Sequence, residues 1–580
     1  MITQQTQAVN GKVLSFKKEG EFFHKRGVAM LEKNNLPDAV MNFRKAVEYS
    51  DGNEEFVVSL AEAFSQMGKF RTSNKIIFMY FPNIEMRPAE CFFGLGCNFA
   101  AMFDYENAIA CMEQYLALKP EGEYVYDACD VLDAIEVIEK DKEKEAAALT
   151  KVEKQHEEIP SIRDVLTADD DDEKYGIKSL EKMMEKERKL FFLRNLLSIK
   201  YYLRQEYDKA REQAELVIKE DAANIHAHCN QIMIAAAQND DETLKKEIEK
   251  IKKHRTENMN ELNRIALTLL EYSSPQDALP VLKHMYTKAP YEHTVIHKLA
   301  ICCYAMDDYK RSIELYDLIT KIDETDDVAV YYRNVCNTAM KTGNKRGGLV
   351  LDYEVPMDEV VSRISRIKSF IQLSFDEQLE MWKNDSATVR LLIWGVRSRD
   401  MGVKRAMLTL ISTFNDKRAE LVLRDFLLRE DEPDELKREV FALLAHMHAK
   451  EPFVAYIGGY LIESHVDMVE FMNKVPKPYR DVLSMCIEKM EANYSSSALF
   501  AAINIWKRYI EAHKDNFTTI NKNQVTALSV ALEYSAAKVT GVDVSRYELC
   551  AKEQISPARF EHAYAKIEPY ITEEVSGEEE

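Results

Sequence analysis

The sequence predicts an all-α protein built as an α-solenoid, in which pairs of antiparallel helices stack into a superhelix. Glycine and proline together account for 33 of the 580 residues, under 6%, against roughly 12% in average proteins. So few helix breakers favour helices and argue against a β-sandwich, a β-barrel or a proline-rich disordered chain. Apolar residues make up 46% of the chain, enough to bury a core. The third observation is a 34-residue periodicity, which decides the fold.

The clearest periodic stretch begins at residue 191 and has further unit starts at 225, 259, 293 and 327. Small residues recur at the eighth and twentieth positions, where the two helices of a pair would cross closely. Large apolar residues recur at the fourth, seventh, eleventh and twenty-fourth positions, where they would fill the space between pairs. One pair cannot bury its apolar face alone, so the pairs are expected to stack. The units at 259 and 293 carry Leu262, Ile265, Ala266, Leu269, Ala278, Leu282, Met285 and Pro290, and Ile296, Leu299, Ala300, Cys303, Ser312, Tyr316 and Ile319.

Three N-terminal units, starting near residues 20, 54 and 89, show the same signature. Their positions are Phe23, Gly27, Met30, Ala39, Phe43 and Ala46, then Leu60, Ala61, Phe64, Gly68 and Ile77, then Phe92, Leu95, Gly96, Phe99, Ala108, Met112 and Pro120. The pattern resembles the tetratricopeptide-repeat (TPR) family, bacterial type, with its W-x2-L-G-x2-Y, A-x3-F, A and P positions. The resemblance covers about 20–137 and 191–342. It implies stacked helical hairpins with a concave groove for a peptide.

The stretch between the two arrays is strongly acidic. Residues 121–190 hold 12 Lys and Arg against 22 Asp and Glu. The run Asp169–Asp172 lacks the spaced ligands and turn glycine of a calcium loop, so a solvated linker is expected. Two helices are predicted here, over 124–138 and 141–158.

The pattern changes after residue 342. Gly343–Gly348 is expected to form a loop that closes the second array, and it lacks the P-loop spacing. Val403–Ile411 and Leu436–Leu444 are alike, which resembles a pair of HEAT-type repeats. Two β-prone runs flank Gly458-Gly459 and predict a short β-hairpin.

A small helical bundle is expected at the C-terminus. Within it, Val544–Phe560 resembles the helix-turn-helix family, with Ser556 as the N-cap of the second helix and Pro557 as its first residue. The whole chain is thus divided into an N-terminal segment (1–19), TPR array 1 (20–138), an acidic helical linker (139–190), TPR array 2 (191–348), HEAT-like repeats (349–449), a connecting region with the hairpin (450–495), a helix-turn-helix-like module (496–571) and an acidic tail (572–580).

No sequence feature indicates an enzyme, a cofactor or a metal. His293 and His297 are four residues apart, but no third zinc ligand accompanies them. No nucleophile or dinucleotide motif appears. The ten cysteines form no C-x-x-C pair, and reduced buried thiols are expected. Without an apolar leader or membrane span, the chain is expected to be cytoplasmic.

The expected binding surface is the concave groove. In the TPR family it is lined by the second, fifth, ninth and twelfth positions of each first helix. The family's two-carboxylate clamp would need Lys and Asn where this chain has His24 and Val28, so that clamp is not expected. The candidates carried over by this resemblance are Phe93, Cys97, Phe192, Asn195, Tyr202, Asn260, Asn263, His297 and Tyr304.

A second candidate surface is basic. Residues 390–418 hold seven bases and two acids, although residues 521–571 hold six of each. Because phosphate contacts need a basic surface, these residues define the alternative of nucleic-acid binding. The candidates are Arg390, Arg397, Arg399, Lys404, Arg405, Lys417 and Arg418 in the stretch, and Ser556, Arg559, His562 and Lys566 in the module.

The sequence therefore predicts a non-enzymatic scaffold or adaptor that binds a protein or peptide of unknown identity in the concave groove. A nucleic-acid-binding regulator is the alternative. A third option is an enzyme hidden in 350–497, the least patterned part of the chain. The formal net charge of −21 lies mostly in 121–190 and in the five glutamates of 572–580, so the repeats themselves are nearly neutral.

Overall fold

The structure is a computed structural model. It describes residues 20–50, 52–149, 176–186, 191–457, 460–464, 475–490, 494, 496–513, 517–540, 542 and 544–571. The predicted segment 1–19, the run 169–172, the hairpin glycines and the tail lie outside these residues. The chain divides into two compact units, Met1–Lys25 with Phe43–Ile135 and Gly395–Glu580, and Arg26–Asn42 with Glu136–Trp394.

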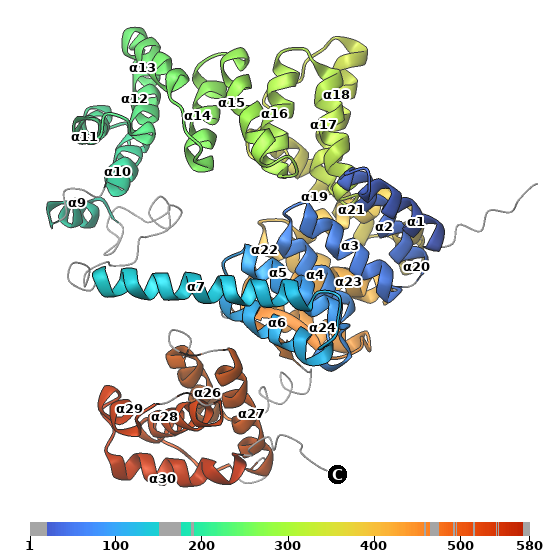
Figure 1. Cartoon of the computed structure of the whole chain (residues 1–580). Coiled ribbons are helices and arrows are strands. Elements are labelled where there is room, and N and C mark those ends of the chain that lie inside the picture. Colours follow the sequence, from blue (N-terminus) through green and yellow to red (C-terminus); the bar gives the residue numbers. More distant parts are fainter. Residues whose placement is uncertain are drawn as a thin grey trace, which may run out of the picture. The chain divides into compact units, whose positions relative to one another are not determined.

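Apart from loops and two short strands, the described chain is helical, which confirms the predicted fold class (Figure 1). Its N-terminal helices are α1 (Gly20–Leu31), α2 (Leu36–Tyr49), α3 (Glu54–Gln66), α4 (Phe70–Tyr80), α5 (Ala89–Ala101), α6 (Tyr105–Leu118) and α7 (Val125–Leu149). Two separate helices were predicted over 124–138 and 141–158. The structure instead has one helix, α7, which continues without a break to Leu149.

The first four 34-residue units of the second array each form one pair of helices, and the fifth contributes the single helix α18. Each first helix begins close to the predicted unit start. These helices are α10 (Phe191–Leu203), α11 (Tyr207–Glu220), α12 (Ile225–Ala237), α13 (Asp241–Lys253), α14 (Met259–Tyr272), α15 (Pro275–Lys288), α16 (His293–Ala305), α17 (Tyr309–Ile322) and α18 (Asp327–Thr342), preceded by α9 (Ile177–Lys186). Figure 1 shows α12 to α18 side by side in chain order. One hydrophobic core runs from Ile225 to Ala339 through these pairs.

The small residues lie where the paired helices approach most closely. Ser312 Oγ donates a 2.8 Å hydrogen bond to the main-chain oxygen of Ala300, and Ser198 Oγ donates one of the same length to that of Ala210. These pairs occupy the eighth and twentieth positions. A Cβ added at Gly96 would lie 2.8 Å from Met112 Cε. The predicted close crossing is therefore confirmed in both arrays.

A common turn joins the two helices of a pair. The residue two places before the second helix has a positive φ at Asn34 (55°), Phe103 (63°), Gln205 (63°), Asn239 (56°) and Asp307 (67°). Several helices then begin at a residue whose side chain accepts an N–H of the first turn, as Asp240 does from Thr243 at 3.1 Å. Such caps stabilise a helix start by about 1 kcal/mol.

The remaining helices follow in chain order. They are α19 (Met357–Ile371), α20 (Phe375–Asn384), α21 (Ser386–Val396), α22 (Met401–Thr413), α23 (Lys417–Leu427) and α24 (Asp434–His446), then α26 (Lys477–Met490), α27 (Ser496–His513), α28 (Lys522–Val539), α29 (Arg546–Lys552) and α30 (Pro557–Ile567), with two 3₁₀ turns, η1 (Ile84–Met86) and η2 (Glu568–Tyr570). Strands β1 (Phe453–Ile457) and β2 (Tyr460–Ser464) pair antiparallel with Phe453 opposite Ser464, which confirms the hairpin. Trp506 is fully buried in the core of the C-terminal helices.

Candidate peptide-binding groove

The groove candidates of the second array divide into two sets. The open set has exposed or half-buried side chains, and the engaged set has buried side chains. Phe192 and Asn260 are exposed, and Tyr202 and Asn263 are half-buried. Asn195, His297 and Tyr304 are buried. Only the open set offers side chains to a partner without rearrangement of the surrounding structure.

His297 on α16 is completely buried and binds on both sides of its ring. Its Nε2 lies 2.9 Å from the main-chain oxygen of Val350, and its Nδ1 lies 3.0 Å from the hydroxyl of Tyr316. Burial lowers the pKa of the imidazole to about 4, so the ring is neutral at pH 7. Since a carbonyl oxygen can only accept, Nε2 carries the proton and Nδ1 accepts from Tyr316.

Tyr304, two turns further along α16 on the same helix face, also contacts main chain. Its hydroxyl accepts the N–H of Arg346 at 2.8 Å and lies 3.4 Å from the oxygen of the same residue. On α18, the Tyr332 hydroxyl donates to the main-chain oxygen of Glu354 at 2.7 Å. The side chains of α16 and α18 thus hold a segment of this chain's own backbone between Arg346 and Glu354.

Tyr332 was not among the predicted groove residues, and it stands at the sixth position of its unit. The same position holds Asn230, Arg264 and Lys298 in the three preceding units. Asn230 links three helices: its Nδ2 donates to the main-chain oxygen of Asn195 at 3.0 Å, and its Oδ1 accepts from Arg264 at 2.9 Å. Polar residues at the sixth position of four consecutive units were the signal in the sequence.

Asn195, at the fifth position of the first unit, also bonds to the next repeat. Its Nδ2 donates to the Oδ1 of Asn224 at 3.1 Å, and the same Oδ1 accepts the main-chain N–H of Ala227, which caps α12. Asn195 therefore joins the first pair of helices to the start of the second. It contributes to packing between repeats, whatever it also does in the predicted groove.

The first array's candidates lie on α5. Phe93 stacks on Tyr124 with ring centroids 4.5 Å apart and planes 9° from parallel. Cys97 is half-buried, and burial raises the pKa of its thiol, so the thiol is protonated at pH 7. Both side chains face the stretch at the start of α7.

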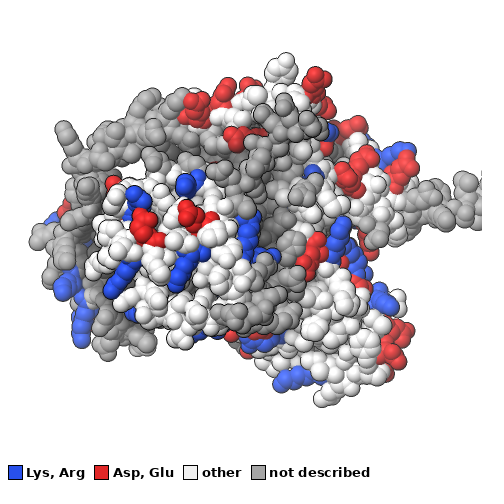
Figure 2. All heavy atoms as spheres, turned by 90° about the horizontal axis from the view of Figure 1, so that it is seen from below, with Lys and Arg blue, Asp and Glu red and all other residues white. Residues whose placement is uncertain are grey.

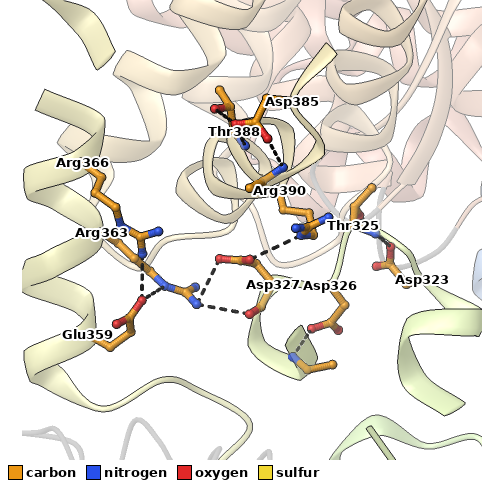
Figure 3. A network of polar contacts seen from close by, with 12 residues as sticks. Asp323, Thr325, Asp326, Asp327, Glu359, Arg363, Arg366, Asp385, Thr388 and Arg390 are labelled. Carbon is orange, nitrogen blue, oxygen red and sulfur yellow. Dashed lines mark hydrogen bonds and ion pairs between the residues drawn. The ribbon is translucent and has the colours of Figure 1, made fainter. Parts of the chain in front are cut away.

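A buried ionic network closes the second array where α18, α19 and α21 meet (Figure 3). Arg363 is 1% exposed; its Nη2 lies 3.0 Å from Asp327 Oδ2, and its Nε donates to Glu359 at 3.0 Å. Arg390, a candidate of the basic stretch, has its Nε 3.7 Å from the other Asp327 oxygen. Burial raises the pKa of Asp327, even though Arg363 and Arg390 favour its charged form. The network fixes the start of α18 against α19.

Three of the other bases of 390–418 pair with acidic side chains from outside the stretch. Lys404 pairs with Glu432, Arg405 with Glu439 at 2.8 Å, and Lys417 with Glu420 at 3.3 Å. Arg397, Arg399 and Arg418 are exposed, and the charge of Arg397 contributes to a lowered pKa of Asp425. Figure 2 shows basic side chains interspersed with acidic ones on the face that it displays.

The candidates of the C-terminal module lie along α30. Ser556, Arg559 and His562 are exposed and Lys566 is half-buried, while Phe560, Ala563 and Ile567 on the same helix are buried. Arg546 on α29 pairs with Glu561 at 2.9 Å. The helix-turn-helix and HEAT resemblances stay predictions.

In the first of the two compact units, a cavity of about 440 Å³ lies between α4 and the residues that follow α23. Its charged residues pair with each other across it: Arg71 lies 3.1 Å from Glu430, and the nearby Lys75 lies 3.3 Å from Asp425. In the described part of the chain, no three His, Cys, Asp or Glu side chains stand close enough to hold a metal. Of the helices that the structure describes, none combines the length and apolar character needed to cross a bilayer.

Comparisons with known proteins agree with the repeats. No family model matches the chain. A curated TPR repeat-containing protein, YvcD of Bacillus subtilis, is 22% identical over 237 residues, which are 40% of this chain and 47% of that protein. The chain thus spans about half the length of the curated relative.

Solved TPR structures also match, with low structural scores. A tetratricopeptide repeat protein of Parabacteroides merdae is 8% identical, covers 55% of this chain and 99% of its own, and has a TM-score of 0.21. The TPR2AB-domain:pHSP90 complex of yeast Sti1 is 11% identical, covers 56% and 97%, and has a TM-score of 0.19. Scores this low carry no argument. The helix pairs of the arrays and the Bacillus relative agree with what the repeat pattern indicated: the chain is built of tetratricopeptide-type helix pairs and is similar to a TPR repeat-containing protein of a bacterium.

Proposed function

We propose that this chain is a non-enzymatic scaffold that binds a protein partner, and that it captures a peptide of that partner with the first helices of the second array. The observation that carries the proposal is the pair of bonds from His297 and Tyr304 to main-chain atoms of Val350 and Arg346. Both side chains stand at positions predicted to line the groove. Their chemistry is therefore suited to a polypeptide backbone.

The open candidates extend this chemistry toward the start of the array. Asn260 and Asn263 on α14 have amides that can donate and accept together, as an extended backbone requires. Phe192 on α10 is 36% exposed and offers apolar contact area. A peptide running from α16 toward α10 would meet these three side chains in turn.

The proposal places the chain in the cytoplasm. All ten cysteines are free thiols, and seven of them are buried. Burial raises the pKa of Cys302 to about 12, which keeps that thiol protonated and unreactive. Free thiols in this number fit a reducing compartment.

A site-specific photo-crosslink tests the proposal. A photoreactive amino acid replaces Asn263 on α14 or, as the control, the exposed Gln276 on the second helix of the same repeat, α15. Irradiation in cells is expected to give a discrete crosslinked protein from position 263 alone. Asn260→Ala should reduce its yield. The same products from both positions, or none from 263, would contradict the proposal.

A further inference from the structure

The segment Lys345–Glu354 follows the second array directly and returns along it. The last helix of the array, α18, ends at Gly343, whose φ of 73° is left-handed and whose N–H bonds to the oxygen of Ala339. A residue with a side chain would be strained in this conformation. The turn carries the chain back from α18 toward α16.

The bonds that hold the segment come from groove-lining helices and end on main-chain atoms. They involve Arg346 with Tyr304, Val350 with His297, and Glu354 with Tyr332. These backbone contacts recur at every fourth residue of the segment. Because they involve no side chain of the segment, they would hold another polypeptide of similar shape equally well.

Side chains of the segment supply the remaining contacts. Leu349 and Tyr353 pack against the core of the array. At the near end, Lys345 donates to the main-chain oxygen of Ala305 at 2.9 Å and pairs with Asp307 at 2.8 Å. The segment is therefore held as a peptide ligand is held, with apolar side chains inserted and backbone atoms bonded.

We propose that Lys345–Glu354 is an internal ligand of the second array, and that a partner peptide binds the helices α16 and α18 by displacing it. The inference rests on the proposed function and adds its regulation and the kind of partner. That partner is a non-helical segment with apolar side chains spaced like Leu349 and Tyr353, and a basic side chain at the position of Lys345 would add the pair with Asp307.

The two halves of the segment differ in how firmly they are held. Residues 345–348 are exposed, whereas 349–354, apart from the exposed Asp352, are half-buried. Gly348 joins the halves with a φ of 68°, and a Cβ built there or on Gly347 would meet nothing within 4 Å. The exposed half can leave first, which opens Tyr304 to an incoming peptide while His297 and Tyr332 are still covered.

A free peptide must compete with the attached segment Lys345–Glu354, and this competition determines how tightly the peptide is expected to bind. A segment attached to its site through a short flexible connection acts at an effective concentration on the order of millimolar. A free peptide of the same sequence must exceed that concentration to bind the intact chain. Removal of the tethered segment should therefore unmask its binding.

The test uses the full chain and a labelled synthetic peptide that copies residues 343–356. In one variant, a Gly-Ser stretch of equal length replaces Lys345–Glu354. The peptide is expected to bind this variant at least about tenfold more tightly than the natural chain. Adding Tyr304→Phe and His297→Phe to the variant should abolish the gain, and Gly347→Ala in the natural chain should bind as weakly as the natural chain itself.

A second variant covers the case in which the Gly-Ser chain loses its helical circular dichroism. Lys345→Ala with Arg346→Pro removes the two bonds of Lys345 and the N–H that Tyr304 accepts, and it leaves the helices unchanged. It should also bind the peptide more tightly than the natural chain. Equal binding of the peptide to the natural chain and the folded variant, or no binding to that variant, overturns the inference.

The result of the peptide-binding test can be distinguished from the result of the photo-crosslink that tests the proposed function. The crosslink at Asn263 reports capture of a partner, whereas the peptide reports occupancy of α16 and α18. Peptide binding as expected with no crosslinked partner would leave the internal ligand standing and remove the proposed function. The reverse result would retain the scaffold and remove its internal ligand.

Discussion

The main-chain N–H of Arg346 donates a 2.8 Å hydrogen bond to the hydroxyl of Tyr304, a residue that belongs to the first helix of a preceding repeat. Tyr304 is 4% exposed with the segment in place, so departure of the segment would uncover this hydroxyl. Whether Tyr304 is covered therefore depends on the position of the segment Lys345–Glu354.

The buried imidazole of His297 should make stability fall in mildly acidic solution. Burial lowers its pKa in the folded chain to about 4, against an ordinary value of 6.5. Protonation therefore favours the unfolded chain, and the stabilisation by the neutral ring is complete above pH 6.5 and lost progressively toward pH 4. Thermal melts from pH 7 to 4 should show a smaller pH-dependent fall for His297→Gln than for the natural chain. His562→Gln, at an exposed position of α30, is the control, and a fall in His297→Gln equal to that of the natural chain would be evidence against this account.

His228 should have the opposite effect. Its Nδ1 lies 2.6 Å from Glu247, its Nε2 lies 3.0 Å from the main-chain oxygen of Ala222, and the bond to Glu247 raises its pKa. The charged ring donates on both sides, so its stabilisation is complete below pH 6.5 and is lost as pH rises through the raised pKa. His228→Gln should flatten the decline in stability above pH 6.5, measured by hydrogen exchange in α12 and α13. An unchanged decline in stability would show that a group other than the His228–Glu247 pair causes it.

The network at Arg363 should depend on both partners being present. Arg363→Met leaves Asp327 buried without its main counter-charge, and loss of one partner of a buried pair costs about 3–5 kcal/mol. The double variant Arg363→Met, Asp327→Leu should recover most of that loss, because two apolar groups need no partner. Hydrogen exchange of α18 and α19 measures both. A double variant no more stable than the single one would mean that the network does more than balance charge.

We expect residues 390–418, the basic stretch, to contribute little to DNA binding. Lys404 and Arg405 already pair with Glu432 and Glu439. Few bases then release counterions from a phosphate backbone, so binding to mixed-sequence DNA at low salt should be weak and unchanged by Arg405→Ala. Arg559→Ala with Lys566→Ala probes the C-terminal module separately. Salt-dependent binding that Arg405→Ala reduces would restore the nucleic-acid alternative.

The sequence predicted the helix pairs because their signal is local. Ala300 and Ser312 stand at fixed positions of one repeat, so periodicity alone places them at the crossing. The left-handed turn residues carry no such signal, since Phe103 and Gln205 share the turn with asparagine and aspartate. Their conformation follows from the packing of the helices on either side.

The contacts of the predicted groove depend on parts of the chain far apart in sequence. His297 and Tyr304 were predicted to meet a peptide, but a bond to a main-chain oxygen leaves no mark in the sequence of the segment that supplies it. The ion pair of Lys404 with Glu432 is hidden for a similar reason: charge counted along 390–418 omits an acid that folding brings beside it.

Hydrogen exchange of the Arg346 amide in the full-length chain tests the central claim most directly. If Tyr304 holds the segment, this amide exchanges slowly in the natural chain, and Tyr304→Phe speeds its exchange by about fivefold, since one such bond contributes about 1 kcal/mol. Amides of α14 should not change. An Arg346 amide that exchanges at the rate of an unstructured peptide, or one that Tyr304→Phe does not affect, would contradict the claim that the array binds this segment.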